Sequence, residues 1–141
     1  MAMLSNPIQE AERYLQNARQ ILSEKAGKAG GYYSDPKYVK MAGNTAWNGV
    51  LVALDGALGV KKSMKKGQRL DIKDYQDAVS KADRKMNIPF LATYESLHKT
   101  LGYDGNLNYK IVQASLEDAE KMINWAGKHY NTSNSSRKTV L

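Results

Sequence analysis

Apolar residues recur at spacings of three and four along most of the chain, and this period constrains the fold more than any other feature of the sequence. Between residues 6 and 26 the repeating positions are Ile8, Ala11, Leu15, Ala18 and Leu22. This spacing places the side chains on one face of an α-helix. Sustained alternation with a period of two, which a half-buried β-strand requires, is found nowhere. The sequence therefore predicts an all-α fold without a β-sheet.

Capping residues divide the chain into four helical segments. Asn6 followed by Pro7, and Asp35 followed by Pro36, are typical helix starts. The side chain of the cap residue accepts a hydrogen bond from one of the free backbone N–H groups of the first turn. Proline suits that turn because it has no backbone N–H that would lack a partner. Glycines supply the stops. The predicted helices cover approximately residues 6–26, 35–58, 71–101 and 108–130. Short connections favour an antiparallel up-down four-helix bundle.

Pro89 lies inside the third of these segments. Proline lacks a backbone N–H, and its ring clashes with the preceding turn of a helix. We therefore predict that the third helix is kinked or split at Pro89, with Asn87 capping the second piece.

The chain has the length of one domain. At 141 residues it can bury a single hydrophobic core, and we place that domain at residues 1–130. Residues 131–141 are rich in Ser, Thr and Asn, and we expect them to form a disordered polar tail. No signal peptide and no apolar run of the ~20 residues that a membrane span needs are present. Together with the absence of cysteine, this favours a cytoplasmic protein.

The second predicted helix carries a stripe of small residues. A glycine inside a helix costs about 1 kcal/mol relative to alanine, so two of them call for a compensating contact. We expect a neighbouring helix to approach closely along the stripe Ala42, Ala46, Gly49, Ala53 and Gly56.

The same helix carries candidate ligand-binding residues. Asn44, Trp47, Asn48 and Asp55 fall on one side of it, and amides beside an indole are suited to lining a pocket for a polar ligand. The alternative is that they make structural hydrogen bonds to a neighbouring helix. Tyrosines are also frequent, and we expect most of them to lie between core and water rather than to form a functional aromatic box.

A basic cluster follows this helix. The net charge of +7 is concentrated in residues 61–70, which hold five cations and no acid. Lys61, Lys62, Lys65, Lys66 and Arg69 are candidates for contacting an anion or a nucleic acid, weakly and without sequence specificity. A solvated loop is the alternative interpretation.

Catalytic signals are weak. Glu95 and His98 have the spacing of a possible acid–base pair on the third helix, but no residue nearby completes a catalytic set. The chain has no cysteine and two histidines. We therefore assign no catalytic residue, no metal site and no cofactor.

Two stretches resemble a known group of proteins. Residues 33–38, YSDPKY, and residues 42–58, AGNTAWNGVLVALDGAL, resemble a family of uncharacterised small bacterial domains over about residues 5–130. More distantly, the order of helices resembles HEPN domains and the helical substrate-binding partners of minimal nucleotidyltransferases. Catalytic HEPN ribonucleases have an Arg followed a few residues later by His. Here the nearest such pair, Arg84 and His98, is much farther apart, so the resemblance implies a non-catalytic member.

These observations lead to one function and one alternative. We expect a non-enzymatic binding or adaptor module of HEPN-like type that engages a protein or nucleotide partner. The partners would be a second copy of the chain, a protein such as a nucleotidyltransferase, and weakly a nucleic acid, with no membrane association. The alternative is a nucleic-acid-binding accessory protein that uses the loop 61–69.

Overall fold

The fold is known from a computed structural model that describes residues 6–63 and 70–140, with side chains described for 6–61 and 70–132. Helix dominates the described residues, which confirms the predicted all-helical class. The α-helices are α1 (Pro7–Lys25), α2 (Pro36–Leu58), α3 (Ile72–Ala82), α4 (Asn87–Tyr94) and α5 (Tyr109–Val140). Shorter elements are the 3-10 turns η1 (Val60–Ser63) and η2 (Arg84–Met86), the π-helix η3 (Glu95–Leu101), and the strands β1 (Lys28–Ala29) and β2 (Tyr32–Tyr33).

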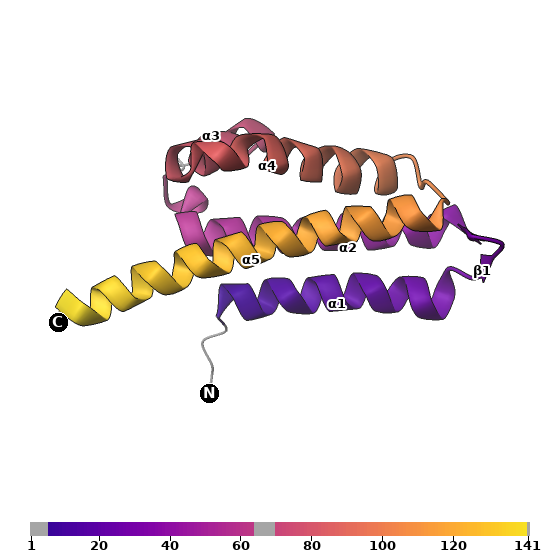
Figure 1. Ribbon diagram of the computed structural model, residues 1–141, viewed down its shortest axis with the longest axis horizontal. Helices are drawn as coiled ribbons and strands as arrows, with labels where there is room; N and C mark the ends of the chain where they lie inside the picture. The colour runs from indigo at the N-terminus through magenta and orange to yellow at the C-terminus, as the bar shows by residue number, and fades with distance from the viewer. Residues whose placement is uncertain (1–5, 64–69, 141) are drawn as a thin grey trace.

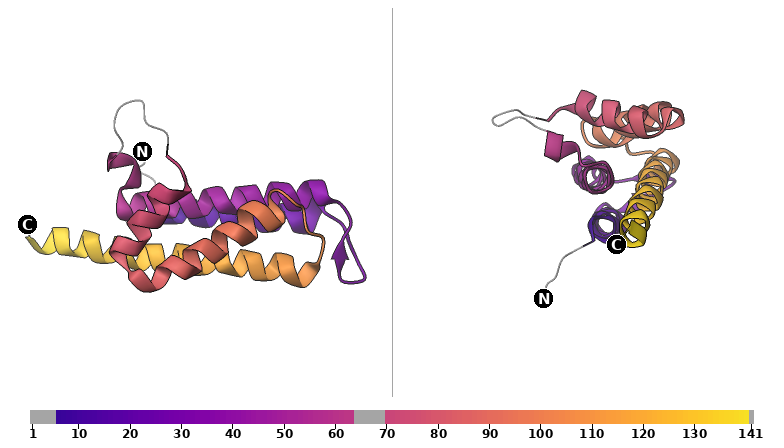
Figure 2. Two further views of the ribbon diagram at one scale, coloured as in Figure 1. Left: turned by 90° about the horizontal axis from the view of Figure 1, so that it is seen from above. Right: turned by 90° about the vertical axis from the view of Figure 1, so that its left-hand side faces the viewer.

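The long helices lie side by side. Figures 1 and 2 show α1, α2 and α5 running along the length of the molecule, with the segment from α3 to η3 on the side of α2 and α5 that faces away from α1. The strands lie at one end. The C-terminal part of α5 projects at the other end, beyond the start of α1.

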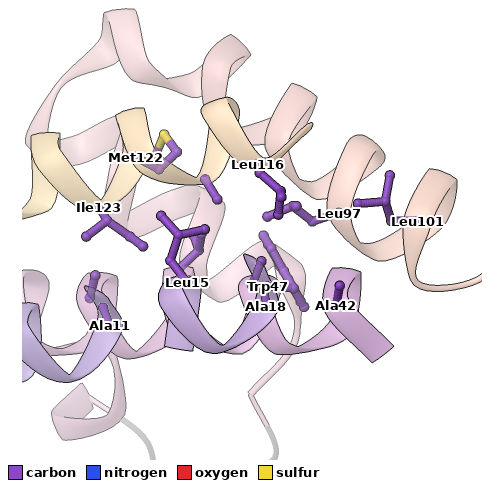
Figure 3. Packing of buried hydrophobic residues seen from close by; sticks show 14 of the residues in the cluster. Ala11, Leu15, Ala18, Ala42, Trp47, Leu97, Leu101, Leu116, Met122 and Ile123 are labelled. Carbon is purple, nitrogen blue, oxygen red and sulfur yellow. The ribbon is translucent and has the colours of Figure 1, made fainter. Parts of the chain in front are cut away.

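The predicted helix starts are confirmed in detail. The Asn6 side chain accepts the backbone N–H of Ile8 at 2.8 Å, and the Asp35 side chain accepts that of Lys37 at 3.0 Å. The stripe predicted for α1 is its buried face, made of Ala11, Leu15, Ala18 and Leu22. Figure 3 shows Leu15 and Ala18 pointing into the same apolar layer as Trp47 of α2 and Leu116 of α5.

The small-residue stripe of α2 is a close helix contact, as expected. A Cβ added at Gly49 would lie 2.8 Å from Cβ of Tyr14 and 3.0 Å from the carbonyl oxygen of Ala11, both on α1. A Cβ at Gly56 would clash with the ring of Pro7. Since real Cβ atoms do not approach so closely, α1 and α2 pack at this distance only because these positions are glycine.

The third segment breaks earlier than predicted. α3 ends at Ala82, and Asp83 is extended (φ −161°, ψ 103°), with its side chain accepting the N–H of Lys85 at 3.1 Å to start η2. Pro89 follows inside the first turn of α4, where a missing N–H costs little. The third segment is therefore split, as predicted, but the break lies at Asp83 and not at Pro89 itself.

The predicted role of Asn87 is wrong. α4 has no side-chain cap, and the Asn87 side-chain oxygen instead accepts Gln76 Nε2 at 3.1 Å and Ser80 Oγ at 3.0 Å. Asn87 is thus the first residue of α4, and its side chain ties α4 back to α3 instead of capping the helix.

A β-hairpin corrects the expectation that the chain has no β-sheet. β1 and β2 pair antiparallel, with Lys28 opposite Tyr33 and Ala29 opposite Tyr32. The two linking residues, Gly30 and Gly31, have φ of 59° and 84°. Glycine adopts such angles without a steric penalty, which is why Gly-Gly is a favoured two-residue hairpin turn. Each strand is too short to produce a visible alternation in the sequence.

The last helix is longer than its predicted span of residues 108–130. α5 continues to Val140, across residues 131–140 where the composition predicts a disordered tail. No glycine or proline in this stretch ends the helix. The Thr132 hydroxyl donates to the carbonyl of Lys128 at 2.9 Å, within the helix itself. Among the described residues, no helix is both long and apolar enough to cross a bilayer.

Candidate ligand-binding cleft

A cavity of about 360 Å³ lies at the end of the molecule that carries the strands. We call it the hairpin cleft. Its walls come from the last turns of α1, from the hairpin and from the first turns of α5. The lining residues are Arg19, Leu22, Ser23, Gly27, Lys28, Tyr33, Tyr109, Gln113 and Leu116.

Backbone hydrogen bonds hold these three segments together. The N–H of Tyr33 donates to the carbonyl of Leu107 at 2.8 Å, and that of Tyr109 donates to Gly31 at 3.0 Å. On the other side, the N–H of Ser34 donates to Ala26 at 3.2 Å. The hairpin is therefore bonded both to the end of α1 and to the start of α5, so the cleft has fixed walls.

The floor combines apolar side chains with one polar pair. Leu22, Tyr33 and Leu116 are buried, and Tyr33 is only 5% exposed. The Tyr33 hydroxyl oxygen accepts Gln113 Nε2 at 2.9 Å. No acceptor for the hydroxyl hydrogen of Tyr33 is found within the part of the chain that the structure describes. The phenol thus retains a hydrogen that it can donate to a molecule in the cleft.

The Tyr33 phenol is neutral at pH 7, and its pKa is raised further by burial. Desolvation raises the pKa of Tyr33 above its ordinary value of 10.0, the hydrogen bond from Gln113 opposes that rise, and the neighbouring Tyr109 adds to it. A raised pKa means that Tyr33 is fully protonated at neutral pH. It is then a hydrogen-bond donor at the floor of the cleft.

The rim of the cleft is positive. The ammonium of Lys28 lies 3.7 Å from the centre of the Tyr109 ring, a cation–π contact. Arg19 Nη2 contacts Glu120 Oε1 at 2.9 Å, and both side chains are substantially exposed. Glu120 itself does not line the cleft, so the lining contributes two cations and no carboxylate. An anion in the cleft would meet both cations, and at Arg19 it would compete with Glu120.

The lining of the cleft offers groups suited to recognising a ligand. It holds donors, two cations and two aromatic rings. No group of three or more His, Cys, Asp or Glu side chains, among the described residues, has the geometry to hold a metal ion.

The residues predicted on α2 are engaged elsewhere. Asn44 Nδ2 donates to the carbonyl of Gly102 at 3.4 Å, and Asp55 Oδ1 accepts the N–H of Lys61 at 2.7 Å. Trp47 is buried, with ring centres 5.4 Å from Tyr94 and 5.9 Å from Phe90, and Asn48 is exposed. None of the four lines the hairpin cleft. Their binding of a ligand stays a prediction.

The basic cluster falls mostly outside the described residues. Lys61 is exposed, and Lys62 is part of η1. Lys65, Lys66 and Arg69 lie outside the described residues, so their contact with an anion also stays a prediction.

Glu95 and His98 both lie on the π-helix η3. His98 stacks on Tyr94, with ring centres 5.2 Å apart and planes at 15°, while Glu95 Oε2 contacts Lys99 Nζ at 3.2 Å. Each side chain thus has a contact of its own with another residue. Neither lines the hairpin cleft.

A second cavity, of about 530 Å³, lies at the opposite end. We call it the distal groove. Apolar residues of α2 and α3 line it, together with Asp74, Asp77, Lys81 and His129. Val60 and Leu70, which flank the basic cluster, also contribute to its wall.

Sequence reasoning missed the hairpin cleft as a site. Its residues form no motif, and Tyr33 and Gln113 are 80 positions apart. One signal was available: Gly30-Gly31 between two short segments is typical of a two-residue hairpin turn. It would have located the hairpin, although not the helices that close the cleft.

One family of known proteins matches most of the chain. The sequence pattern of the family described as "Domain of unknown function (DUF5618)" matches residues 6–128. The chain belongs to this family. The match includes the whole hairpin cleft and stops short of the last turns of α5. It is consistent with the uncharacterised family that residues 33–58 resemble.

A solved structure is similar as well. It is a protein of unknown function from Dyadobacter fermentans, with 40% sequence identity and a TM-score of 0.80. The similarity covers 89% of this DUF5618 chain and 98% of the other. No curated protein matches the chain.

Proposed function

We propose that this DUF5618 protein is a non-catalytic binding module that holds a small anionic ligand in the hairpin cleft. One observation carries the proposal: Arg19 and Lys28 stand at the rim of a cleft whose floor contains a buried phenol, Tyr33, with a hydrogen left to donate. The lining has no acid that would repel an anion.

Size and rigidity support this function. A cavity of about 360 Å³ falls in the range of roughly 300–1,000 Å³ that is typical of small-molecule sites. Its polar groups are few and converge on one volume, which is the arrangement that fixes a ligand's orientation. Because the backbone bonds at Tyr33 and Tyr109 hold the walls in place, a ligand would order little of the protein on binding.

We further propose that the module is HEPN-like and acts as an adaptor. Two features support this: α1, α2, the segment from α4 to η3, and α5 alternate in direction along the molecule (Figures 1 and 2), and the order of helices resembles that of HEPN domains. The proposed ligand is then a nucleotide, and the proposed protein partners are a nucleotidyltransferase and a second copy of the chain. The exposed apolar side chains Met41 and Ile111 support self-association.

The test is an NMR titration with ribose 5-phosphate. We expect amide shifts confined to residues 19–33 and 109–116. Arg19→Gln and Tyr33→Phe should each weaken binding several-fold, because the first removes a cation and the second the free donor. Lys81→Gln, which removes a cation from the distal groove, is the matched control and should bind as the unmodified protein does.

Two results would contradict the proposal. One is a set of shifts centred away from the cleft. The other is equal weakening by Lys81→Gln and Arg19→Gln, which would indicate attraction to surface charge in general. Circular dichroism of each variant separates loss of binding from loss of fold.

A second candidate function is nucleic-acid binding by the basic cluster. Five cations without an acid in residues 61–70 support it. Titrating a single-stranded RNA against a variant with Lys61, Lys62, Lys65 and Lys66 changed to Gln tests it. For every phosphate that the variant no longer neutralises, the slope of log K against log salt should flatten by about 0.7. Tight RNA binding that this variant abolishes would make nucleic acid the primary partner.

A further inference from the structure

We propose that the ligand of the hairpin cleft carries an aromatic ring beside its anionic group, and that Lys28 leaves the Tyr109 ring to pair with the anion when the ligand binds. The inference rests on the proposed function, which supplies the anion. It adds the place where the aromatic ring of that ligand stacks, the face of Tyr109, and the residue that couples ring and anion, Lys28.

The first observation is the position of the Lys28 ammonium. It lies 3.7 Å from the centre of the Tyr109 ring, directly against an aromatic surface that lines the cleft. A cation–π contact at an exposed site is weak. An organic anion offers the same ammonium a stronger, charge-assisted partner. The contact is therefore one that a ligand can exchange.

The second observation is that the Tyr109 ring is held while Lys28 is free to move. The Tyr109 backbone N–H donates to Gly31, and its ring packs on Tyr33 with centres 5.6 Å apart and planes at 38°. Gln113 in turn fixes the Tyr33 hydroxyl. Lys28 is exposed on β1 and reaches the ring through a flexible four-carbon stem. Movement of Lys28 thus uncovers a rigid aromatic surface.

The third observation is that the groups available to an anion lie near the Tyr109 ring. Lys28 is directly opposite Tyr33 in the hairpin, so the two side chains are on the same face of it. Arg19 completes the rim of the same cleft. An anion between Arg19 and Lys28, accepting the Tyr33 hydrogen, would lie beside the Tyr109 ring. A ring attached to that anion would then stack where the ammonium had been.

The experiment compares three probes that separate ring from charge. Ribose 5-phosphate has the anion alone, adenosine has the ring alone, and adenosine 5′-monophosphate has both. We expect the monophosphate to bind at least tenfold more tightly than ribose 5-phosphate. In Tyr109→Leu this gain should disappear, because the stacking surface is lost, so that the monophosphate and ribose 5-phosphate bind with similar affinity. Tyr109→Phe keeps a ring and should keep the gain.

Lys28→Met gives the sharper signature. Both phosphates should bind more weakly, because a cation is lost. Adenosine should bind equally well or more tightly, because the Tyr109 ring is no longer covered. A residue that served only to hold the hairpin would weaken all three probes together.

Lys28 can also be followed directly. In the free protein the ring current of Tyr109 should shift the Lys28 ε-methylene protons upfield. The monophosphate should return them to their usual position. If the monophosphate binds in the cleft and the upfield shift persists, the exchange does not occur and the inference is wrong.

The two proposals fail differently. Equal affinity for ribose 5-phosphate and the monophosphate would overturn the stacked ring, and with it the nucleotide as ligand, but would leave the anion-binding cleft intact. If no probe shifts residues of the cleft, the proposed function fails and this inference fails with it. Should Tyr109→Leu not fold, the probe ranking in the unmodified protein and in Lys28→Met still decides.

Discussion

The two ends of the molecule hold their cavities in different ways. At the hairpin cleft, hydrogen bonds join segments far apart in the sequence: Gln113 bonds to Tyr33, and the hairpin backbone bonds to the start of α5. Around the distal groove, the hydrogen bonds of Asp55, Asp71 and Asp74 all reach backbone groups within six residues along the chain. The bonds of Asp71 and Asp74 cap α3, and that of Asp55 connects α2 with the η1 turn that follows it directly.

This difference shows where the molecule is preorganised. Local caps define where each helix begins or ends, but by themselves they do not set the distances between helices. Bonds between distant segments fix those distances as well. A site that discriminates between ligands needs fixed distances, so the hairpin end is suited to a small molecule, whereas the larger distal groove is suited to adapting its shape.

The largest effect should come from the floor of the cleft. Leu116 is fully buried between α1, α2 and the hairpin end, and Leu116→Ala should destabilise the protein by roughly 2–5 kcal/mol. The partner measurement is Leu58→Ala in the distal groove, where Leu58 is only partly buried. In urea unfolding, we expect Leu58→Ala to lower the free energy of unfolding clearly less than Leu116→Ala does. Equal losses would contradict the view that the hairpin end is the more rigidly packed.

The next prediction concerns the contact between α1 and α2, which both ends of the molecule share. Gly49 lies between them, at the close contact of α1 with α2, and Gly49→Leu should overpack that contact and cost about 1–3 kcal/mol or more. Amide hydrogen exchange should quicken at both ends together. If only one end responds, the two ends unfold independently of this contact. An unchanged melting temperature would mean that α1 and α2 do not approach as described.

A buried tyrosine at each end allows a matched pH comparison. Burial raises the pKa of Tyr33 and also that of Tyr75, where the charges of Asp55 and Asp74 raise the pKa further. The folded protein thus holds each phenol proton more tightly than the unfolded chain does. Stability present below about pH 10 is therefore lost as the pH rises through the folded pKa. Tyr33→Phe and Tyr75→Phe should each lose less stability in this range than the unmodified protein.

Added salt should change the alkaline loss of stability differently for Tyr33 and Tyr75. Added salt screens the carboxylates near Tyr75, so it should reduce the alkaline loss due to Tyr75 more than that due to Tyr33. At neutral pH, Tyr33→Phe should also cost about 0.5–1.5 kcal/mol for the hydrogen bond to Gln113. Identical salt responses would indicate that burial alone acts at both ends.

The smallest effect concerns the ion pair beside the cleft. Arg19 and Glu120 are partly exposed at 36% and 52%, and a double-mutant cycle with alanine should give a coupling of about 0.2–1 kcal/mol. The same Arg19→Ala variant should lose anion binding markedly. A large coupling energy without any loss of binding would assign Arg19 to the structure instead of to the site.

The sequence by itself determined the helices and most of their ends. The apolar period of α1, the caps Asn6, Asp35 and Asp71, and the glycine stop after α2 are local features, and local interactions between residues a few positions apart suffice to specify them. The small-residue stripe of α2 also predicted its close contact, because glycine destabilises a helix unless a neighbouring helix occupies the space that a side chain would fill.

Only the tertiary structure decided the break at Asp83, the β-hairpin and the cleft. Either Asp83 or Pro89 can interrupt a helix, and the bonds from Gln76 and Ser80 to Asn87 set where α4 turns back onto α3. A two-residue strand has no period to detect, and this one is held by the carbonyl of Leu107, far along the chain. Arg19, Lys28, Tyr33, Tyr109 and Gln113 share one cavity because three segments pack together. The spacing of residues along the sequence does not reveal contacts between segments that are this far apart.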